Sequence, residues 1–371
     1  MYSEHKVLDV HGHMRAVVPA SSYLALLLGS NTAIASPLSG SPNDLVAPFL
    51  AMKKQDMVPQ SSNDDIRKLA DTHARYLEAR NIDVQLLGPH PVEFHGWLPP
   101  ALFKEWTSFI NDLIFRFCQA RPDRFVGACQ LPQLATEKDA SHMLPELERC
   151  VQNYAFAATY VFPDPTGRRE SPLLSERYWY PLYDYCQANE LPIIVHGSGS
   201  LDQRFQTIPL DSQMAFLWEQ YYSLMALRHS DVFEQFPRLR ILVCHCGGAL
   251  DRFVQQSPLV NPKPGRVPSE NLFFDTCAHD LDFLAAAVHQ RSPAQMCFGS
   301  EAPGTGGLKR PGTDRTVDDL VPMFAEHPKL SFLSEEEKLQ ILHYNPAKFC
   351  PGLADPIAVN KKARRAVRME Q

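Results

Sequence analysis

The sequence predicts an α/β protein built on one barrel of eight parallel strands. Three observations predict this fold. Eight short apolar runs recur along the chain, amphipathic stretches separate them, and several runs are almost continuously hydrophobic. Strands covered by helices on both faces have this composition, and strand–helix alternation places the strands parallel to one another. We therefore expect a distorted (β/α)8 TIM barrel over residues 1–350.

The eight runs follow one another as barrel strands should. Amphipathic segments such as Leu102–Cys118 and Tyr178–Asn189 precede the third and fifth runs, where helices are expected. The predicted strands are Val7–His11, Val84–Pro89, Phe125–Pro132, Ala157–Pro163, Pro192–Gly197, Arg240–Cys246, Leu272–Thr276 and Gln295–Glu301.

One connection is much longer than the others. The first two runs start at positions 7 and 84, whereas later starts are 23 to 48 residues apart. The surplus, residues 14–63, follows the first strand, so we expect an insertion over the barrel mouth, either a lid or a decoration without substrate contact. Residues 351–371 are rich in Lys and Arg, and we expect a solvated, frayed basic tail.

Composition excludes several classes of function. Apolar residues make up 44% of the chain and charged residues 21%, with a net charge of −6, which is typical of a soluble globular protein. A mildly acidic chain lacks the positive field that nucleic acid or an anionic membrane attracts. The N-terminus has no apolar signal-peptide core, and the nine cysteines form no CxxC pair. We therefore expect a cytoplasmic protein with reduced thiols.

The first run ends in a pair of histidines. In Asp9-Val10-His11-Gly12-His13, strand alternation places Asp9, His11 and His13 on one face, directed into the barrel mouth. Two imidazoles that are two residues apart on a strand can bind one metal ion. The sequence therefore predicts a metal site at the end of the first strand.

Three other strands add ligands at the same edge. The fifth run ends in His196, the sixth in His245 and the eighth in Glu301, and barrel enzymes keep their active sites at the carboxyl ends of the strands. Imidazoles with one carboxylate suit Zn²⁺ or another borderline divalent ion and leave a position for water, whose pKa such an ion lowers to about 7. Cys244 and Cys246 flank His245, and we expect strand alternation to place these thiols in the core, opposite the imidazole.

Further candidates follow the same strand ends. We expect Asp275, at the end of the seventh run, to accept a hydrogen bond from a ligand histidine. Arg15 and Arg252 can bind a substrate carboxylate through the planar guanidinium, Arg252 in its own or a neighbouring subunit; for Arg15 the alternative is a salt bridge within the lid. The other two candidates for substrate binding are His90 and His279.

Longer stretches resemble a known family. They are ARPDRFVGACQLP, VFPDPTG, ERYWYPLYDYCQANELPIIVHG, FPRLRILVCHCGGALDRF, NLFFDTCAHD and YNPAKFC. Over nearly the whole chain they resemble the amidohydrolase superfamily, in the branch typified by aminocarboxymuconate semialdehyde decarboxylase.

The resemblance implies a set of roles. One divalent ion, zinc or else manganese, would be held by His11, His13, His196 and the strand-eight acid Glu301. His245 would orient or deprotonate the water. The fourth run, ATYVFPDP, lacks the lysine that binuclear members carbamylate, which favours one ion.

The strand-eight motif departs from the usual pattern of the branch. FGSEAPGTGG carries Glu301 where Asp is usual, and in this it is similar to lignin-catabolism members, namely the hydrolase of a biphenyl-derived ring-cleavage product and the oxalomesaconate hydratase. The longer side chain can bind the metal or act as a general base. FFDTCAHD favours the C–C hydrolase.

The expected function follows from this site and this resemblance. We expect water to be added to an unsaturated small carboxylate derived from aromatic ring opening, with hydrolysis of a C–C bond or hydration, in a homodimer or larger assembly. The alternatives are nonoxidative decarboxylation at the same site, amide or ester hydrolysis, and a non-catalytic metal-binding scaffold.

Overall fold

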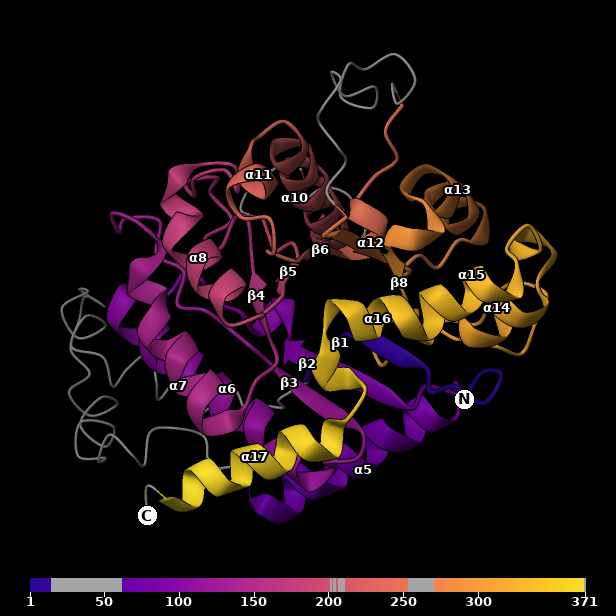
Figure 1. Ribbon diagram of the computed structural model, residues 1–371, viewed down its shortest axis with the longest axis horizontal. Helices are drawn as coiled ribbons and strands as arrows, with labels where there is room; N and C mark the ends of the chain where they lie inside the picture. The colour runs from indigo at the N-terminus through magenta and orange to yellow at the C-terminus, as the bar shows by residue number, and fades with distance from the viewer. Residues whose placement is uncertain (15–61, 201, 203–204, 206–210, 253–269, 370–371) are drawn as a thin grey trace, which may run out of the picture.

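The computed structural model describes residues 1–14, 62–200, 202, 205, 211–252 and 270–369 (Figure 1). Its centre is one eight-stranded sheet with strands in chain order, every adjacent pair parallel. The strands are β1 (Leu8–Met14), β2 (Val84–Pro89), β3 (Phe125–Cys129), β4 (Ala158–Val161), β5 (Ile193–Val195), β6 (Ile241–Val243), β7 (Leu272–Asp275) and β8 (Met296–Cys297).

Hydrogen bonds join the last strand to the first. The Val10 N–H donates to the Phe298 carbonyl (2.9 Å), and the Glu301 N–H donates to the His11 carbonyl (2.8 Å). These bonds connect the segment after β8 to β1, so the sheet curls around on itself as the predicted barrel does. Every strand residue is buried, as expected for parallel strands between a core and a layer of helices.

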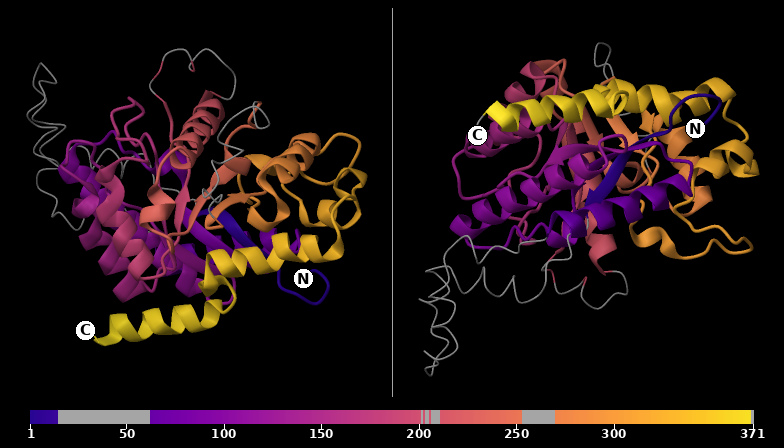
Figure 2. Two further views of the ribbon diagram at one scale, coloured as in Figure 1. Left: turned by 45° about the horizontal axis from the view of Figure 1, so that its top comes forward. Right: turned by 90° about the horizontal axis from the view of Figure 1, so that it is seen from below.

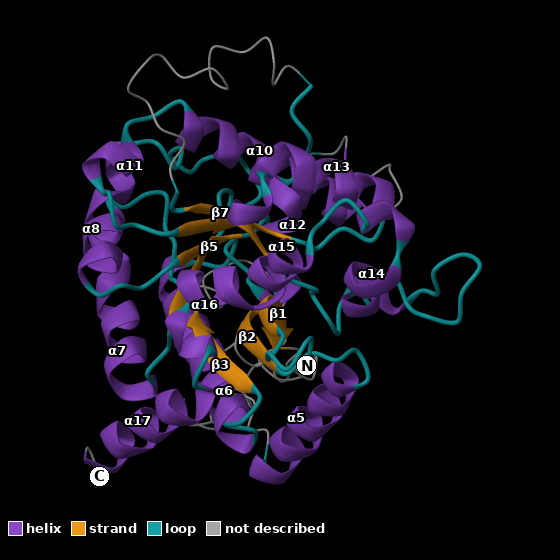
Figure 3. Cartoon of the chain, turned by 45° about the vertical axis from the view of Figure 1, so that its right-hand side comes forward, coloured by secondary structure: helices purple, strands orange, loops and turns teal. Residues whose placement is uncertain are grey.

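Helices surround the sheet (Figure 3). They are α5 (Asn63–Glu78), α6 (Pro100–Ala120), α7 (Leu144–Tyr154), α8 (Tyr180–Ala188), α10 (Asp211–Arg228), α11 (Val232–Gln235), α12 (Cys244–Gly247), α13 (Leu281–Arg291), α14 (Val321–Glu326), α15 (Glu335–Leu339), α16 (Asn345–Phe349) and α17 (Pro356–Met369). Among the described helices, none is both long enough and apolar enough to cross a bilayer.

The C-terminal segment differs from the expected frayed tail. Residues 356–369 form α17, which lies along the outside of the molecule beside α7 (Figure 2). Asn360 is 4% exposed, and its Nδ2 donates to the carbonyls of Pro122 (3.2 Å) and Phe125 (2.9 Å). Ala363 is fully buried on the same face. The expectation of a frayed, solvated tail was therefore wrong for this helix: Lys361, Lys362 and Arg365 are exposed, whereas Asn360 and Ala363 pack against the protein.

All eight predicted strands are present, but some ends differ. The sixth strand stops at Val243, and the short α12 that follows is not a regular helix: His245 and Cys246 within it form a left-handed turn, with φ of 52° and 57°. Strand alternation therefore does not set the direction of the His245 ring, although Cys244 and Cys246 are buried as expected. Most of the predicted insertion, residues 15–61, lies outside the described residues, as does Arg15.

Candidate active site

Three histidine rings converge at the carboxyl edge of the sheet. His11 and His13 come from β1, and His196 directly follows β5. All three are at most 2% exposed, and their ring centroids lie 4.9 to 5.1 Å apart. The structure thus brings together the histidines that strand-end placement predicted.

The hydrogen bonds of these rings determine where their protons lie. His11 Nδ1 lies 2.6 Å from Asp275 Oδ2, His13 Nδ1 lies 2.9 Å from the Pro89 carbonyl, and His196 Nδ1 lies 2.7 Å from the Gly197 carbonyl. Since each partner can only accept, each Nδ1 carries the proton and donates. Each neutral ring therefore presents an unprotonated Nε2.

These Nε2 atoms lie close together, and that of His196 has no donor. His11 Nε2 and His13 Nε2 are 3.0 Å apart, and His196 Nε2 is buried without a hydrogen-bond partner in the described structure. Buried lone pairs without a donor are unfavourable unless a cation binds them. Zn–N bonds of about 2.0–2.1 Å allow one ion to bind two nitrogens at this separation.

Burial and neighbours tune the basicity of the three rings. Burial, together with the adjacent imidazoles, lowers the pKa of His13 and His196 well below the usual value. Burial also opposes protonation of His11, but the hydrogen bond and charge of Asp275 outweigh it and raise the pKa of His11. Asp275 accepts further bonds from the Cys246 and Cys277 N–H groups (2.9 and 3.1 Å), so its predicted contact with a site histidine is present and fixed.

Glu301 brings a carboxylate to the histidines. It is 8% exposed, with Oε1 3.8 Å from His13 Nε2 and Oε2 3.4 Å from His245 Nε2. Burial alone would raise the pKa of Glu301, but the hydrogen bond and charge of His245, with His11 and His13, lower it well below the usual value. The side chain is therefore held as an anion.

Gln220 orients His245, which sequence analysis did not foresee. The Gln220 amide is satisfied when its oxygen faces the Gly197 N–H (3.1 Å) and His245 Nδ1 (2.9 Å) and its nitrogen donates to the Phe216 carbonyl (3.3 Å). His245 Nδ1 then donates to Gln220, which fixes the ring with Nε2 directed at Glu301 Oε2, 3.4 Å away. No motif marks Gln220, because it lies on a largely apolar helix.

A buried network holds the strand-eight loop against β1. Asp9 accepts from Ser300 Oγ (2.5 Å), Ser300 N (3.1 Å) and Gln85 Nε2 (2.9 Å), and burial raises its pKa to about 6. The register shift in β1 between Asp9 and Gly12 accompanies this arrangement. Asp9 therefore positions the strand-eight loop against β1, and both of its carboxylate oxygens already accept hydrogen bonds from these donors.

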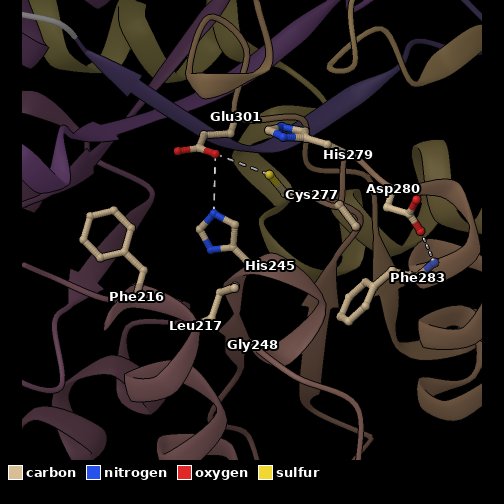
Figure 4. A pocket seen from close by; sticks show the side chains of 10 residues that line it. Phe216, Leu217, His245, Gly248, Cys277, His279, Asp280, Phe283 and Glu301 are labelled. Carbon is tan, nitrogen blue, oxygen red and sulfur yellow. Dashed lines mark hydrogen bonds and ion pairs between the residues drawn. The ribbon is translucent and has the colours of Figure 1, made fainter. Parts of the chain in front are cut away.

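The remaining predicted residues lie at different distances from the centre. The His90 ring is 5.6 Å from that of His13. His279 lines a cavity with His245, Cys277 and Glu301, and burial lowers its pKa (Figure 4). Arg252 is exposed and does not line that cavity.

A closed parallel barrel with buried imidazoles and a carboxylate at its carboxyl edge defines a metal-dependent barrel hydrolase or lyase. The chain belongs to the amidohydrolase family: the family model matches residues 9–351. Enzymes of this family bind a divalent metal ion.

Individual relatives carry more specific names. A 2-keto-4-carboxy-3-hexenedioate hydratase from Sphingobium sp. (strain NBRC 103272 / SYK-6) is 27% identical, covering 83% of this chain and 90% of the relative. A 2-amino-3-carboxymuconate-6-semialdehyde decarboxylase from Dictyostelium discoideum is 22% identical, covering 75% and 78%. The crystal structure of a 4-oxalomesaconate hydratase from Rhodopseudomonas palustris superposes with a TM-score of 0.74 at 25% identity, covering 98% and 100%.

Proposed function

We propose that one divalent ion, zinc in the native protein or else manganese, is held by His11, His13, His196 and Glu301. The observation that carries this proposal is the convergence of three Nε2 lone pairs. Each ring is held by a hydrogen bond that its Nδ1 donates, and the Nε2 atom of His196 has no hydrogen-bond partner. The donor set of imidazoles and one carboxylate is the one that zinc prefers.

His245 is the alternative fourth ligand. One ligand atom from each of His11, His196, His245 and Glu301 lies within 4.8 Å of the others. We assign His13 to the ion because its Nε2 lies only 3.0 Å from His11 Nε2, and we assign His245 to proton transfer because its Nε2 faces Glu301.

We propose that the enzyme adds water to an unsaturated carboxylic acid derived from aromatic ring cleavage and hydrolyses a C–C bond, or hydrates the double bond. A bound divalent ion lowers the pKa of water and polarises a substrate carbonyl. His245 Nε2 accepts the proton of the attacking water, and Glu301 Oε2, 3.4 Å away, can share it. In C–C hydrolysis the hydroxyl joins the carbonyl carbon, and the proton returns from His245 to the carbon that leaves.

Substrate carboxylates would be bound by arginine. Arg15 and Arg252 are our candidates, with His90 and His279 as polar contacts at the barrel mouth. The amidohydrolase relatives support a carboxylic acid as the substrate, since two of them are named as hydratases of keto or oxalo carboxylic acids.

Nonoxidative decarboxylation at the same site is the second candidate, favoured by the similarity to a decarboxylase. The two reactions differ in their products. With candidate ring-cleavage acids in H₂¹⁸O, hydrolysis places ¹⁸O in a new carboxylate and hydration places it in a hydroxyl group, whereas decarboxylation releases CO₂ without net uptake of water. Release of CO₂ without ¹⁸O incorporation would overturn the first candidate.

We further propose a reduced cytoplasmic location and a homodimer or larger assembly. The nine cysteines are free and buried, which supports a reducing compartment. The outer face of α10 exposes Met214, Trp218 and Tyr222 among the described residues, and such an apolar stripe supports self-association. Light scattering coupled to size-exclusion chromatography tests the assembly, and a monomer at micromolar concentration would contradict it.

A further inference from the structure

The centre described above opens into a cavity whose far side is apolar. The cavity measures about 260 Å³, and its lining includes both His245 and Glu301, so a group bound there lies next to the reacting atoms. Figure 4 shows Phe216 and Phe283 on either side of His245, with Glu301 and His279 above it. We define the apolar wall as Phe216 and Leu217 of α10, Ala278 after β7, and Phe283 of α13.

The first half of this wall is fixed by close packing. A Cβ on Gly197 would lie 2.2 Å from the Phe216 backbone, and a Cβ on Gly248 would lie 2.3 Å from the Leu217 carbonyl oxygen. Only glycine permits α10 to pack so closely against these two loops. The Phe216 ring also meets the His196 ring edge-on, with centroids 5.4 Å apart. Phe216 is therefore held at a set position relative to the histidine cluster.

The second half is fixed by a helix cap. Asp280 accepts a hydrogen bond from the Phe283 N–H (2.8 Å) and begins α13, which sets the backbone position of Phe283. The Arg310 Nη1 donates to the His279 carbonyl (2.8 Å), which ties down the loop that carries Ala278. Both halves of the wall are thus built before any ligand binds.

The charges around the cavity select against an anionic group on the wall. Among the described residues that line it, the ionised groups are the carboxylates of Glu301 and Asp280, and none is a Lys or Arg. A second ligand carboxylate placed against the wall, and not at the proposed metal ion, would be removed from water beside Asp280 with no Lys or Arg among the described lining residues, which is unfavourable. An uncharged apolar group would instead displace water from apolar surface.

The size of the cavity suits an aromatic ring. A dry apolar cavity of about 150 Å³ is known to hold benzene, and this one is larger and remains open toward the reacting centre. Aromatic side chains also favour offset or edge-on contact with another ring.

We propose that the substrate carries an aryl group that binds between Phe216 and Phe283, while its keto acid end faces the histidine cluster. This inference rests on the proposed function and narrows its substrate class: an aryl-bearing keto or unsaturated acid, not a linear di- or tricarboxylate. Phe216 and Phe283 are then residues that determine specificity.

The test compares three 2-oxo acids that differ only at the fourth carbon. They are 2-oxo-4-phenylbutanoate, 2-oxoglutarate and 2-oxobutanoate, titrated calorimetrically into zinc-loaded full-length protein. The phenyl acid should bind on the order of 10- to 100-fold more tightly than 2-oxobutanoate, the effect expected from burying a phenyl group, and 2-oxoglutarate should gain nothing. Preferential binding of 2-oxoglutarate would overturn the aryl assignment.

Variants locate the effect. Phe283→Ser should weaken binding of the phenyl acid by roughly tenfold and leave 2-oxobutanoate unchanged. Phe332→Ser is the matched control, because Phe332 is 41% exposed, stacks on His289 and does not line the cavity. Equal loss for all three acids in Phe283→Ser would contradict a role in selecting the aryl group.

The outcomes separate this inference from the function on which it rests. If all three acids bind equally well and binding is lost when zinc is removed, the proposed function stands and the aryl inference fails. If none of them binds to the zinc-loaded protein, recognition of keto acids at the metal fails, and the inference fails with it.

Discussion

Asp275→Asn keeps the size and shape of the side chain, yet it should lower the affinity for zinc by about 10- to 100-fold, the usual effect of losing a partner that orients a ligand histidine. Asp275 Oδ2 accepts from His11 Nδ1 at 2.6 Å, while Oδ1 accepts from two backbone N–H groups at 2.9 and 3.1 Å. All the groups that face the carboxylate are therefore donors. An amide has only one oxygen, so its NH₂ must face a donor on one side or the other.

Both orientations of the asparagine are costly. If the amide oxygen keeps the backbone bonds, its NH₂ opposes the His11 Nδ1 proton and favours the tautomer with a proton on Nε2, which cannot bind metal. If the oxygen faces His11, two buried backbone donors lose their acceptor. An unsatisfied buried donor costs about 1–3 kcal/mol, so we expect the free energy of unfolding of the metal-free protein to fall by a similar amount.

Chelator competition measures the zinc affinity, and urea unfolding of the metal-free protein measures stability. Asp282→Asn is the control, since Asp282 is exposed and pairs with Lys329 at the surface. The reasoning would be refuted if Asp275→Asn bound zinc as tightly as Asp282→Asn.

Three further predictions follow from other parts of the molecule. His245→Ala should keep the metal content and lower kcat by about 10²–10⁴-fold, the usual effect of losing a general base. Metal analysis and steady-state kinetics check this, and loss of the ion would show that His245 is a ligand instead. Asn360→Ala should lower the free energy of unfolding by about 2 kcal/mol because buried carbonyls lose their donor, whereas exposed Lys361→Ala should not; equal urea midpoints would contradict this role. Burial, with the charge of Asp164, raises the pKa of Glu219 to about 7. The folded state therefore keeps a proton on Glu219 at pH values where the unfolded state has already lost it. This group consequently lowers the free energy of unfolding as the pH rises from about 4.5 to 7. Glu219→Gln should therefore stabilise the protein by about 1–2 kcal/mol at pH 8 and not at pH 4, whereas Glu326→Gln at the surface should change neither; an equal gain at both pH values would refute the titration.

The barrel could be predicted because its signal is local. Strands buried on both faces must be apolar along their length, and polar residues such as His196 and Asp275 stand out where each run ends. Because the carboxyl ends of parallel strands all lie at the same edge of the sheet, the positions of the strands in the sequence were enough to predict that these side chains lie together. The cluster of candidate metal ligands could therefore be predicted without any knowledge of side-chain geometry.

What the sequence could not reveal depends on contacts between distant segments. The left-handed turn at His245 and Cys246 is unusual for residues with a side chain, and Asp275 stabilises it by accepting from the Cys246 N–H. The Gln220 side chain meets His245 only because α10 packs against the loop after β6. No periodicity in the sequence records such a contact.

The C-terminal helix shows the same limit from another side. Its basic composition indicated a solvated segment, and the outer residues are indeed exposed. Asn360 and Ala363 nevertheless form a narrow buried face against the helical layer. Net charge describes the exposed side of such a helix and does not reveal whether its other side is packed.

The central claim is that the histidine cluster binds one divalent ion. The most direct test is the metal content of protein purified without chelator or affinity metal, measured alongside His11→Ala and His196→Ala, with His142→Ala as a control outside the site. We predict about one transition metal ion per chain in the unmodified protein and in His142→Ala, and loss of the tightly bound ion in the other two variants. Absence of a bound ion even after reconstitution with zinc or manganese would contradict the account.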